Sequence, residues 1–144
     1  MFKYIAKNSP FYPLRIFLYK KCGYRIGESV YIAEGLTIAE KLDDIDNIII
    51  GDRVAIGPNV ILLSSSDPNN SRIYPYVKIH RGKVTVADDA WIGAGSIIMP
   101  DIYIGEGSVV GAGSVVTKNV EAFSIVAGVP AKKIGDVNHN ENLA

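Results

Sequence analysis

The chain has 144 residues, 48% of them hydrophobic, which is enough for one folded domain with a sizeable core. Its formal net charge is zero, which argues against a nucleic-acid-binding surface, because neutralising phosphates requires an excess of Lys or Arg. The single cysteine, Cys22, excludes an internal disulfide, and no apolar run reaches the roughly 18 residues of a membrane span. The default expectation is therefore a cytoplasmic protein.

Residues 1–23 are predicted to form a short helical cap. Pro13 stands near the start of the expected helix and Gly23 near its end. Residues 1–27 contain six basic side chains and no acidic one. Two roles remain open for this segment. It can cover the open end of a repeat core, or it can present a basic amphipathic patch to a membrane surface.

Residues 24–135 follow a period of six. An aliphatic residue recurs at this spacing, and the residue after it is often Gly or Ala, which we expect to let the backbone turn tightly through positive φ. Because this period is neither helical nor alternating, it predicts an all-β fold, a parallel β-helix whose inward aliphatics stack from coil to coil. The recurring residues include Ile26, Ile32, Ile38, Ile50, Ile56, Leu62, Val86, Ile92, Ile98, Ile104, Val110 and Val116.

Two segments interrupt the period. In residues 42–47, Asp44 stands where an aliphatic residue is expected; we interpret this segment as a solvated surface turn, with a substrate contact as the alternative. Residues 64–83 lack the period for about twenty residues, and we expect an extruded, ordered loop with a functional role. Beyond the repeats, residues 136–144, with His139, are predicted to form a flexible tail without a role.

Three motifs resemble the hexapeptide-repeat acyltransferases, the family of maltose, galactoside and polysaccharide O-acetyltransferases. They are IIIGDRVAIGPNVILL before the loop, AWIGAGSIIMPDIYIGEGSVVGAGSVVTKNV after it, and SIVAGVPAKKI near the end. The resemblance covers residues 24–135 and implies a left-handed β-helix that forms a homotrimer. It also implies transfer of an acetyl group from acetyl-CoA to a hydroxyl or amine, on a sugar or polysaccharide precursor, in active sites shared between subunits. No metal is expected.

The same resemblance assigns an acetyl-CoA groove. Around the WIGAG motif it implies contact with the pantetheine arm and a backbone N–H that polarises the thioester carbonyl. Around the last coils it implies lysines that match the CoA phosphates. The alternatives are turn geometry for the small residues, a packed aromatic for the tryptophan and solvated lysines. The implied cofactor-binding residues are Trp91, Gly93, Ala94, Ala112, Gly113, Thr117, Lys118, Lys132 and Lys133.

The chain departs from the family at Asp67. The family usually carries a histidine before a proline at the start of the loop, and this histidine acts as general base. Here Asp67 precedes Pro68, and an ordinary aspartate, with a pKa of about 3.9, is a weak base at neutral pH. Three alternatives remain open: desolvation raises the pKa of Asp67, His80 is the base and Asp67 orients it, or an amine acceptor needs little help.

Two other functions remain open. A scaffold or ligand-binding trimer would keep the fold without the base, but it would have no reason to keep a groove that matches phosphates. The γ-class carbonic anhydrases share the six-residue period, but they need three histidines around zinc, and His80 is the only histidine inside the repeat region.

Overall fold

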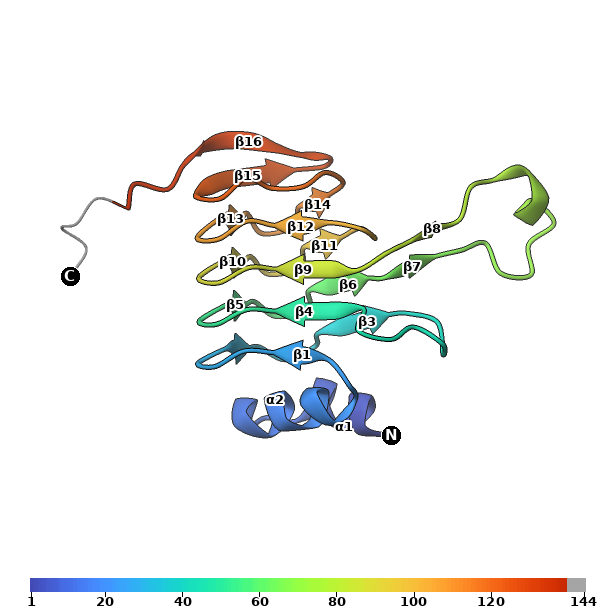
Figure 1. The fold of residues 1–144 in the computed structure, drawn as a ribbon, viewed down its shortest axis with the longest axis horizontal. Helices are drawn as coiled ribbons and strands as arrows, with labels where there is room; N and C mark the ends of the chain where they lie inside the picture. The colour runs from blue at the N-terminus through green and yellow to red at the C-terminus, as the bar shows by residue number, and fades with distance from the viewer. Residues whose placement is uncertain (140–144) are drawn as a thin grey trace.

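The computed structural model describes residues 1–139, which form a left-handed parallel β-helix with two helices at its N-terminal end (Figure 1). The predicted all-β class is confirmed. The cap consists of two helices, α1 (Phe2–Asn8) and α2 (Tyr12–Lys21), because the chain becomes extended at Ser9, just before Pro10. A short 3₁₀ helix, η1 (Tyr74–Tyr76), lies in the extruded loop.

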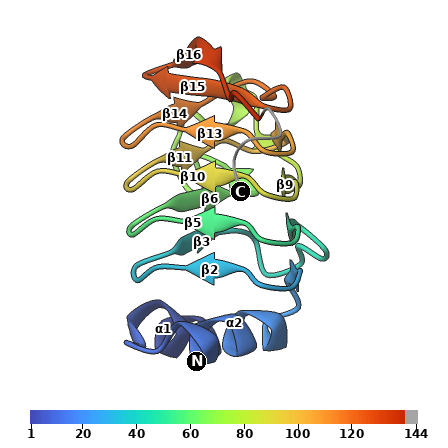
Figure 2. The same cartoon turned by 90° about the vertical axis from the view of Figure 1, so that its left-hand side faces the viewer.

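Three sheets form the three sides of the β-helix, and each coil visits them in turn (Figures 1 and 2). The first sheet contains β1 (Arg25–Ile26), β4 (Ile48–Ile50), β9 (Val84–Val86) and β12 (Tyr103–Ile104). The second contains β2 (Tyr31–Ile32), β5 (Ala55–Ile56), β10 (Trp91–Ile92), β13 (Val109–Val110), β15 (Ser124–Gly128) and β16 (Ala131–Asp136). The third contains β3 (Thr37–Ala39), β6 (Ile61–Leu63), β11 (Ile97–Ile98) and β14 (Val115–Val116).

The core is built from the aliphatic residues of the six-residue period. In the second sheet, Ile92 pairs with Ile56 in the coil before and with Val110 in the coil after, and all three are 0% exposed. Burying each such side chain contributes about 1.5–3 kcal/mol. The contribution exists only when the next coil covers the residue, so the coils are stable as a stack.

The small residues beside these aliphatics serve a different purpose from the one predicted. Gly93 does not have a positive φ; a Cβ on it would lie 2.5 Å from the backbone nitrogen of Ala112 in the next coil. Positive φ occurs instead three residues after the aliphatic, as at Gly95 (φ 67°) and Asp101 (φ 63°). Gly93 is therefore required by the spacing between coils, and the corner is turned by the later residue.

Both ends of the β-helix are covered. At one end, Leu18 and Tyr19 of α2 are buried against the first coil. At the other end, β16 folds back antiparallel on β15. Beyond β16, the His139 ring stacks on Phe123 with ring centroids 4.1 Å apart. The flexibility predicted for residues 136–144 stays a prediction, and residues 140–144 lie outside the described part of the chain.

Candidate active site

Two insertions leave the β-helix at the same edge, between the third and the first sheet (Figure 1). One coil of three hexapeptides takes 18 residues, as from Val86 to Ile104, but Ile50 follows Ile26 by 24 residues and Val86 follows Ile50 by 36. The extra residues lie within 40–47 and 64–83. We call this side of the molecule the loop edge.

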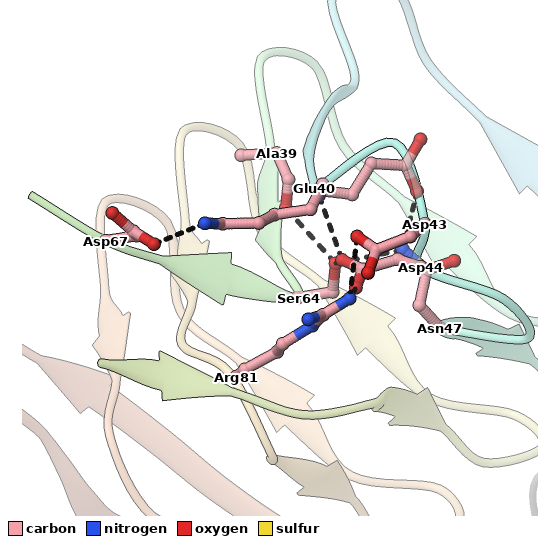
Figure 3. A network of polar contacts seen from close by, with 9 residues as sticks. Ala39, Glu40, Asp43, Asp44, Asn47, Ser64, Asp67 and Arg81 are labelled. Carbon is pink, nitrogen blue, oxygen red and sulfur yellow. Dashed lines mark hydrogen bonds and ion pairs between the residues drawn. The ribbon is translucent and has the colours of Figure 1, made fainter. Parts of the chain in front are cut away.

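A polar network joins the two insertions close to where they leave the β-helix (Figure 3). The carboxylate of Asp44 accepts hydrogen bonds from the backbone N–H of Lys41 at 3.0 Å, the hydroxyl of Ser64 at 3.0 Å and Nε of Arg81 at 2.7 Å. Its side chain is only 5% exposed. The interpretation of Asp44 as part of a solvated turn is therefore wrong, because this carboxylate anchors the second insertion to the first.

Hydrogen bonds keep Asp44 ionised although it is buried. Desolvation alone would raise its pKa, but the N–H of Lys41, the guanidinium of Arg81 and the hydroxyl of Ser64 outweigh that effect. The pKa of Asp44 is therefore held below its ordinary value. Arg81 also reaches Asp43 at 3.0 Å, so this one cation connects two carboxylates of the first insertion.

The second insertion begins and ends as a two-stranded arm. Its strands β7 (Ser65–Ser66) and β8 (His80–Arg81) pair antiparallel, and the arm projects from the β-helix (Figure 1). The expected ordered loop is present, but its tip does not pack on the rest of the chain: Tyr76 is 85% exposed and no residue of η1 is buried.

Both candidate bases lie at the root of this arm. Asp67 directly follows β7, and its carboxylate binds the ammonium group of Lys41 and accepts the N–H of Asn69. The hydrogen bond from Lys41, and then that from Asn69, hold the pKa of Asp67 below its ordinary value. For the single chain this contradicts the first alternative, a pKa raised by desolvation.

The histidine is placed differently. His80 lies on β8 opposite Ser66, is exposed, and its ring has no hydrogen-bond or ion-pair partner within residues 1–139. Asp67 is held by Lys41, so the expected carboxylate–imidazole pair does not form within the described chain. Lys41 is the residue that the sequence analysis missed, because it lies in an insertion, 26 positions from its partner.

Four of the implied cofactor residues gather in one pocket of about 310 Å³ at the last coils: Thr117, Lys118, Lys132 and Lys133. Lys133 is partly neutralised by Asp136 at 2.8 Å, and that carboxylate raises its pKa. Lys118 and Lys132 have no ion-pair partner in the part of the chain that the structure describes. The pocket therefore presents two cations that remain available for an anion.

The WIGAG motif lies at another edge, between the second and the third sheet. Its corner stacks directly on the next one, since the N–H of Gly113 donates to the carbonyl of Ala94 at 2.8 Å. The N–H of Gly93 is already used, because it donates to Val110 at 2.7 Å, whereas that of Ala94 has no hydrogen-bond partner within residues 1–139. Trp91 is 57% exposed on the outer side of the second sheet.

One chain thus divides the predicted residues between two edges. Asp67, His80 and Lys118 lie along the loop edge, whereas Ala94 and Ala112 lie at the edge between the second and third sheets. Across residues 1–139, no group of three His, Cys, Asp or Glu side chains is placed to hold a metal ion.

Comparison with known proteins gives a consistent result. A family model described as "Bacterial transferase hexapeptide (six repeats)" matches residues 83–118. The galactoside O-acetyltransferase of Escherichia coli (strain K12) is 33% identical over 141 residues, which cover 98% of this chain and 67% of that protein. The chain spans 46% to 67% of the length of this and two other curated relatives.

Solved structures are also similar. A hexapeptide-repeat acetyltransferase from Vibrio cholerae, solved with acetyl-CoA, has a TM-score of 0.76 and 25% identity, covering 95% of this chain and 84% of that one. A galactoside acetyltransferase in complex with coenzyme A has a TM-score of 0.68 and 26% identity, covering 95% of this chain and 78% of the other.

Proposed function

The chain belongs to the hexapeptide-repeat family of acetyl-CoA-dependent acetyltransferases, and we propose that it transfers an acetyl group from acetyl-CoA to a hydroxyl or amine of a sugar. The pocket with the unpaired Lys118 and Lys132 is the observation that carries this proposal. Two exposed cations beside a pocket suit the phosphates of CoA, because charge-assisted hydrogen bonds to phosphate are among the strongest that proteins make. The acetyl-CoA and the coenzyme A bound in two similar structures support the same chemistry.

We propose Ala94 as the residue that polarises the thioester. Its backbone N–H lacks a hydrogen-bond partner within residues 1–139, whereas that of the neighbouring Gly93 is committed to the coil. A fixed N–H aimed at the carbonyl oxygen stabilises the negative charge that develops there as the acceptor attacks. Trp91, on the same coil, would flank the pantetheine arm with its exposed ring.

The active unit in this proposal is a homotrimer. Ala94 lies at a different edge from His80 and Lys118, so one chain cannot present all three to one substrate, whereas a neighbouring copy packed side by side can. The outward positions of the third sheet support such packing, because Ile61, Ile97 and Val115 form an apolar column there. Each active site would then combine the loop edge of one chain with the other edge of its neighbour.

We assign the catalytic base to His80. Imidazole suits a base at neutral pH, whereas Asp67 is a weaker base because Lys41 lowers its pKa. In the transfer step the acceptor oxygen bonds to the acetyl carbon and the carbon–sulfur bond of the thioester breaks. His80 takes the proton of the acceptor hydroxyl and returns it to the departing CoA sulfur.

Calorimetric titration with acetyl-CoA tests the donor site. We expect Lys118→Ala to weaken binding about tenfold, as the loss of one charge-assisted hydrogen bond predicts. The control Lys78→Ala removes an exposed cation outside the pocket and should bind like the unchanged protein. If the unchanged protein does not bind acetyl-CoA, the transferase proposal is wrong and a scaffold remains.

Release of the CoA thiol in the presence of a panel of sugars tests the base. His80→Ala should lower kcat about 100-fold or more, because general-base catalysis contributes at least that much. Asp67→Asn should lower it less, since this carboxylate is held by Lys41. Equal rates for the unchanged protein and His80→Ala would rule out the assignment of the base.

A further inference from the structure

The two N-terminal helices turn an apolar surface away from the β-helix. They lie across its end (Figures 1 and 2), and large apolar side chains on them are 42% to 76% exposed. Scattered exposed apolar residues are ordinary, but their concentration within the first 17 residues, on two helices that cover one end, points to a contact surface. We call it the basal face and define it by Phe2, Tyr4, Ile5, Phe11, Leu14 and Phe17.

Helical spacing separates this face from the core. In α2, the buried Leu18 and Tyr19 pack on the first coil. Phe17 and Lys21, four residues apart, share another side of the helix, and Leu14 is exposed beside them. The exposed side of α2 therefore carries Leu14 and Phe17 beside Lys21, whereas a helix that only covered the core would need no large apolar residues there. Covering the core explains the inner side and leaves the outer side unexplained.

The charge of the helices complements an anionic surface. No residue of α1 or α2 is acidic, and Lys20 and Lys21 are both exposed in the last turn of α2. Glu28 reaches Lys20 from the first coil at 3.5 Å, but ion pairs between such exposed side chains contribute little. Lys21 has no acidic partner in the described residues, and its ammonium lies 5.5 Å from the centre of the Phe17 ring.

We propose that the basal face binds the surface of a membrane that contains anionic lipids. Aromatic and aliphatic side chains enter the boundary between headgroups and acyl chains, and flanking lysines bind lipid phosphates, as in helices that lie in the membrane interface. Among the described residues no helix is long and apolar enough to cross a membrane, and the proposed contact is with the membrane surface. A second copy of the face is a poorer occupant, because self-association would bring like charges together around Lys20 and Lys21.

The proposal also fits the position of the face. The arm projects from the side of the β-helix, and α1 and α2 lie at one end of it (Figure 1). The pocket around Lys118 is formed by the last coils, beside β15 and β16 at the other end. Attachment by the basal face leaves the loop edge accessible. Subunits packed side by side, as proposed above, would bring several basal faces to one end, and linked weak contacts bind much more tightly than one.

Sedimentation with lipid vesicles tests the proposal on the full chain. The protein should bind vesicles of phosphatidylcholine with phosphatidylglycerol at least about tenfold more tightly than vesicles of phosphatidylcholine alone, and added salt should weaken the binding. The double variant Leu14→Ser/Phe17→Ser should lose this binding. The matched control Tyr103→Ser removes a side chain of similar exposure, 49% against 54% for Phe17, on the first sheet, and should retain it.

A charge variant gives a second, independent reading. Lys20→Glu/Lys21→Glu changes only exposed residues and should lower binding to the anionic vesicles about tenfold or more. Failure of the unchanged protein to bind either vesicle, or unaltered binding by the Leu14→Ser/Phe17→Ser variant, overturns the proposal. Concentration-dependent association without vesicles that the same double variant abolishes also overturns it, because a second copy would then cover the face.

Discussion

The regular coils between Val84 and Val116 and the two insertions at the loop edge are built by different rules. In the coils, an inward residue meets its equivalent eighteen positions away, so one period determines every contact. In the insertions, Lys41 meets Asp67 after 26 positions and Asp44 meets Arg81 after 37, and no period relates them. The coils supply the apolar core, whereas the insertions supply charged groups held in fixed positions.

The largest effect should come from the core of the coils. Ile92→Ala removes a side chain that is 0% exposed and should lower the free energy of unfolding by about 2–5 kcal/mol. Replacing residues 68–79 by Gly-Gly removes the tip of the arm, which contains no buried residue. This replacement should change the free energy of unfolding by less than about 1 kcal/mol. Urea unfolding followed by circular dichroism measures both. Similar losses would show that the arm belongs to the cooperative core.

A smaller effect distinguishes two kinds of glycine within the coils. Gly93→Ala places a Cβ 2.5 Å from the backbone of the next coil and should cost up to about 3 kcal/mol, as overpacking does. Gly113→Ala meets no atom within 4 Å but has a φ of 69°, and should cost about 1 kcal/mol through backbone strain alone. The same unfolding measurement applies. The reverse order would mean that coil spacing adjusts more easily than φ.

The sequence predicts the regular coils well because one six-residue period relates their residues. Each aliphatic of the period, such as Ile56 or Ile98, faces inward because its place in the period is enough to fix its direction. The purpose of the neighbouring glycines was predicted wrongly, since the close approach between coils depends on residues of the next coil, as for Gly93 and Ala112. The number of helices in the cap was also underestimated, because Ser9 and Pro10 divide it.

The candidate site was predictable only in part. Lys118, Lys132 and Ala94 were located through motifs that resemble those of the family. The structure brings the two lysines to one pocket, and the roles of all three residues stay predictions. Asp44 was misread and Lys41 was missed, because their partners lie on another insertion and only the folded chain brings the two together. Pairings between insertions follow no period, so a single sequence contains no signal for them.

The network at the loop edge allows a sharper comparison. Asp44→Asn weakens hydrogen bonds to Arg81 and Ser64, so the arm should open more often and the amide of Gly82, bonded to Ser64 at 2.9 Å, should exchange about tenfold faster. Asp43→Asn is the matched control. Asp43 binds the same arginine, but its side chain is 76% exposed, and exchange should change less than about twofold. Hydrogen–deuterium exchange of the segment 64–83 measures both, and equal acceleration would show that burial of Asp44 is unimportant.

The smallest effect is the response of the arm to acid. Hydrogen bonds lower the pKa of Asp44 and of Asp67. Each carboxylate therefore stabilises the anchored position of the arm fully above its ordinary pKa of about 3.9, and progressively less as the pH falls through its lowered pKa. We therefore expect the protection of the amides of residues 64–83 from hydrogen exchange to stay constant from about pH 7 to pH 5 and to decrease below about pH 4. The measured rates are first corrected for the pH dependence of intrinsic exchange. The coils, whose cores are apolar, should keep their protection through the start of this fall. The variant Asp44→Asn/Asp67→Asn should remove the acid dependence, and an unchanged fall in protection below about pH 4 in this variant would show that other groups cause it.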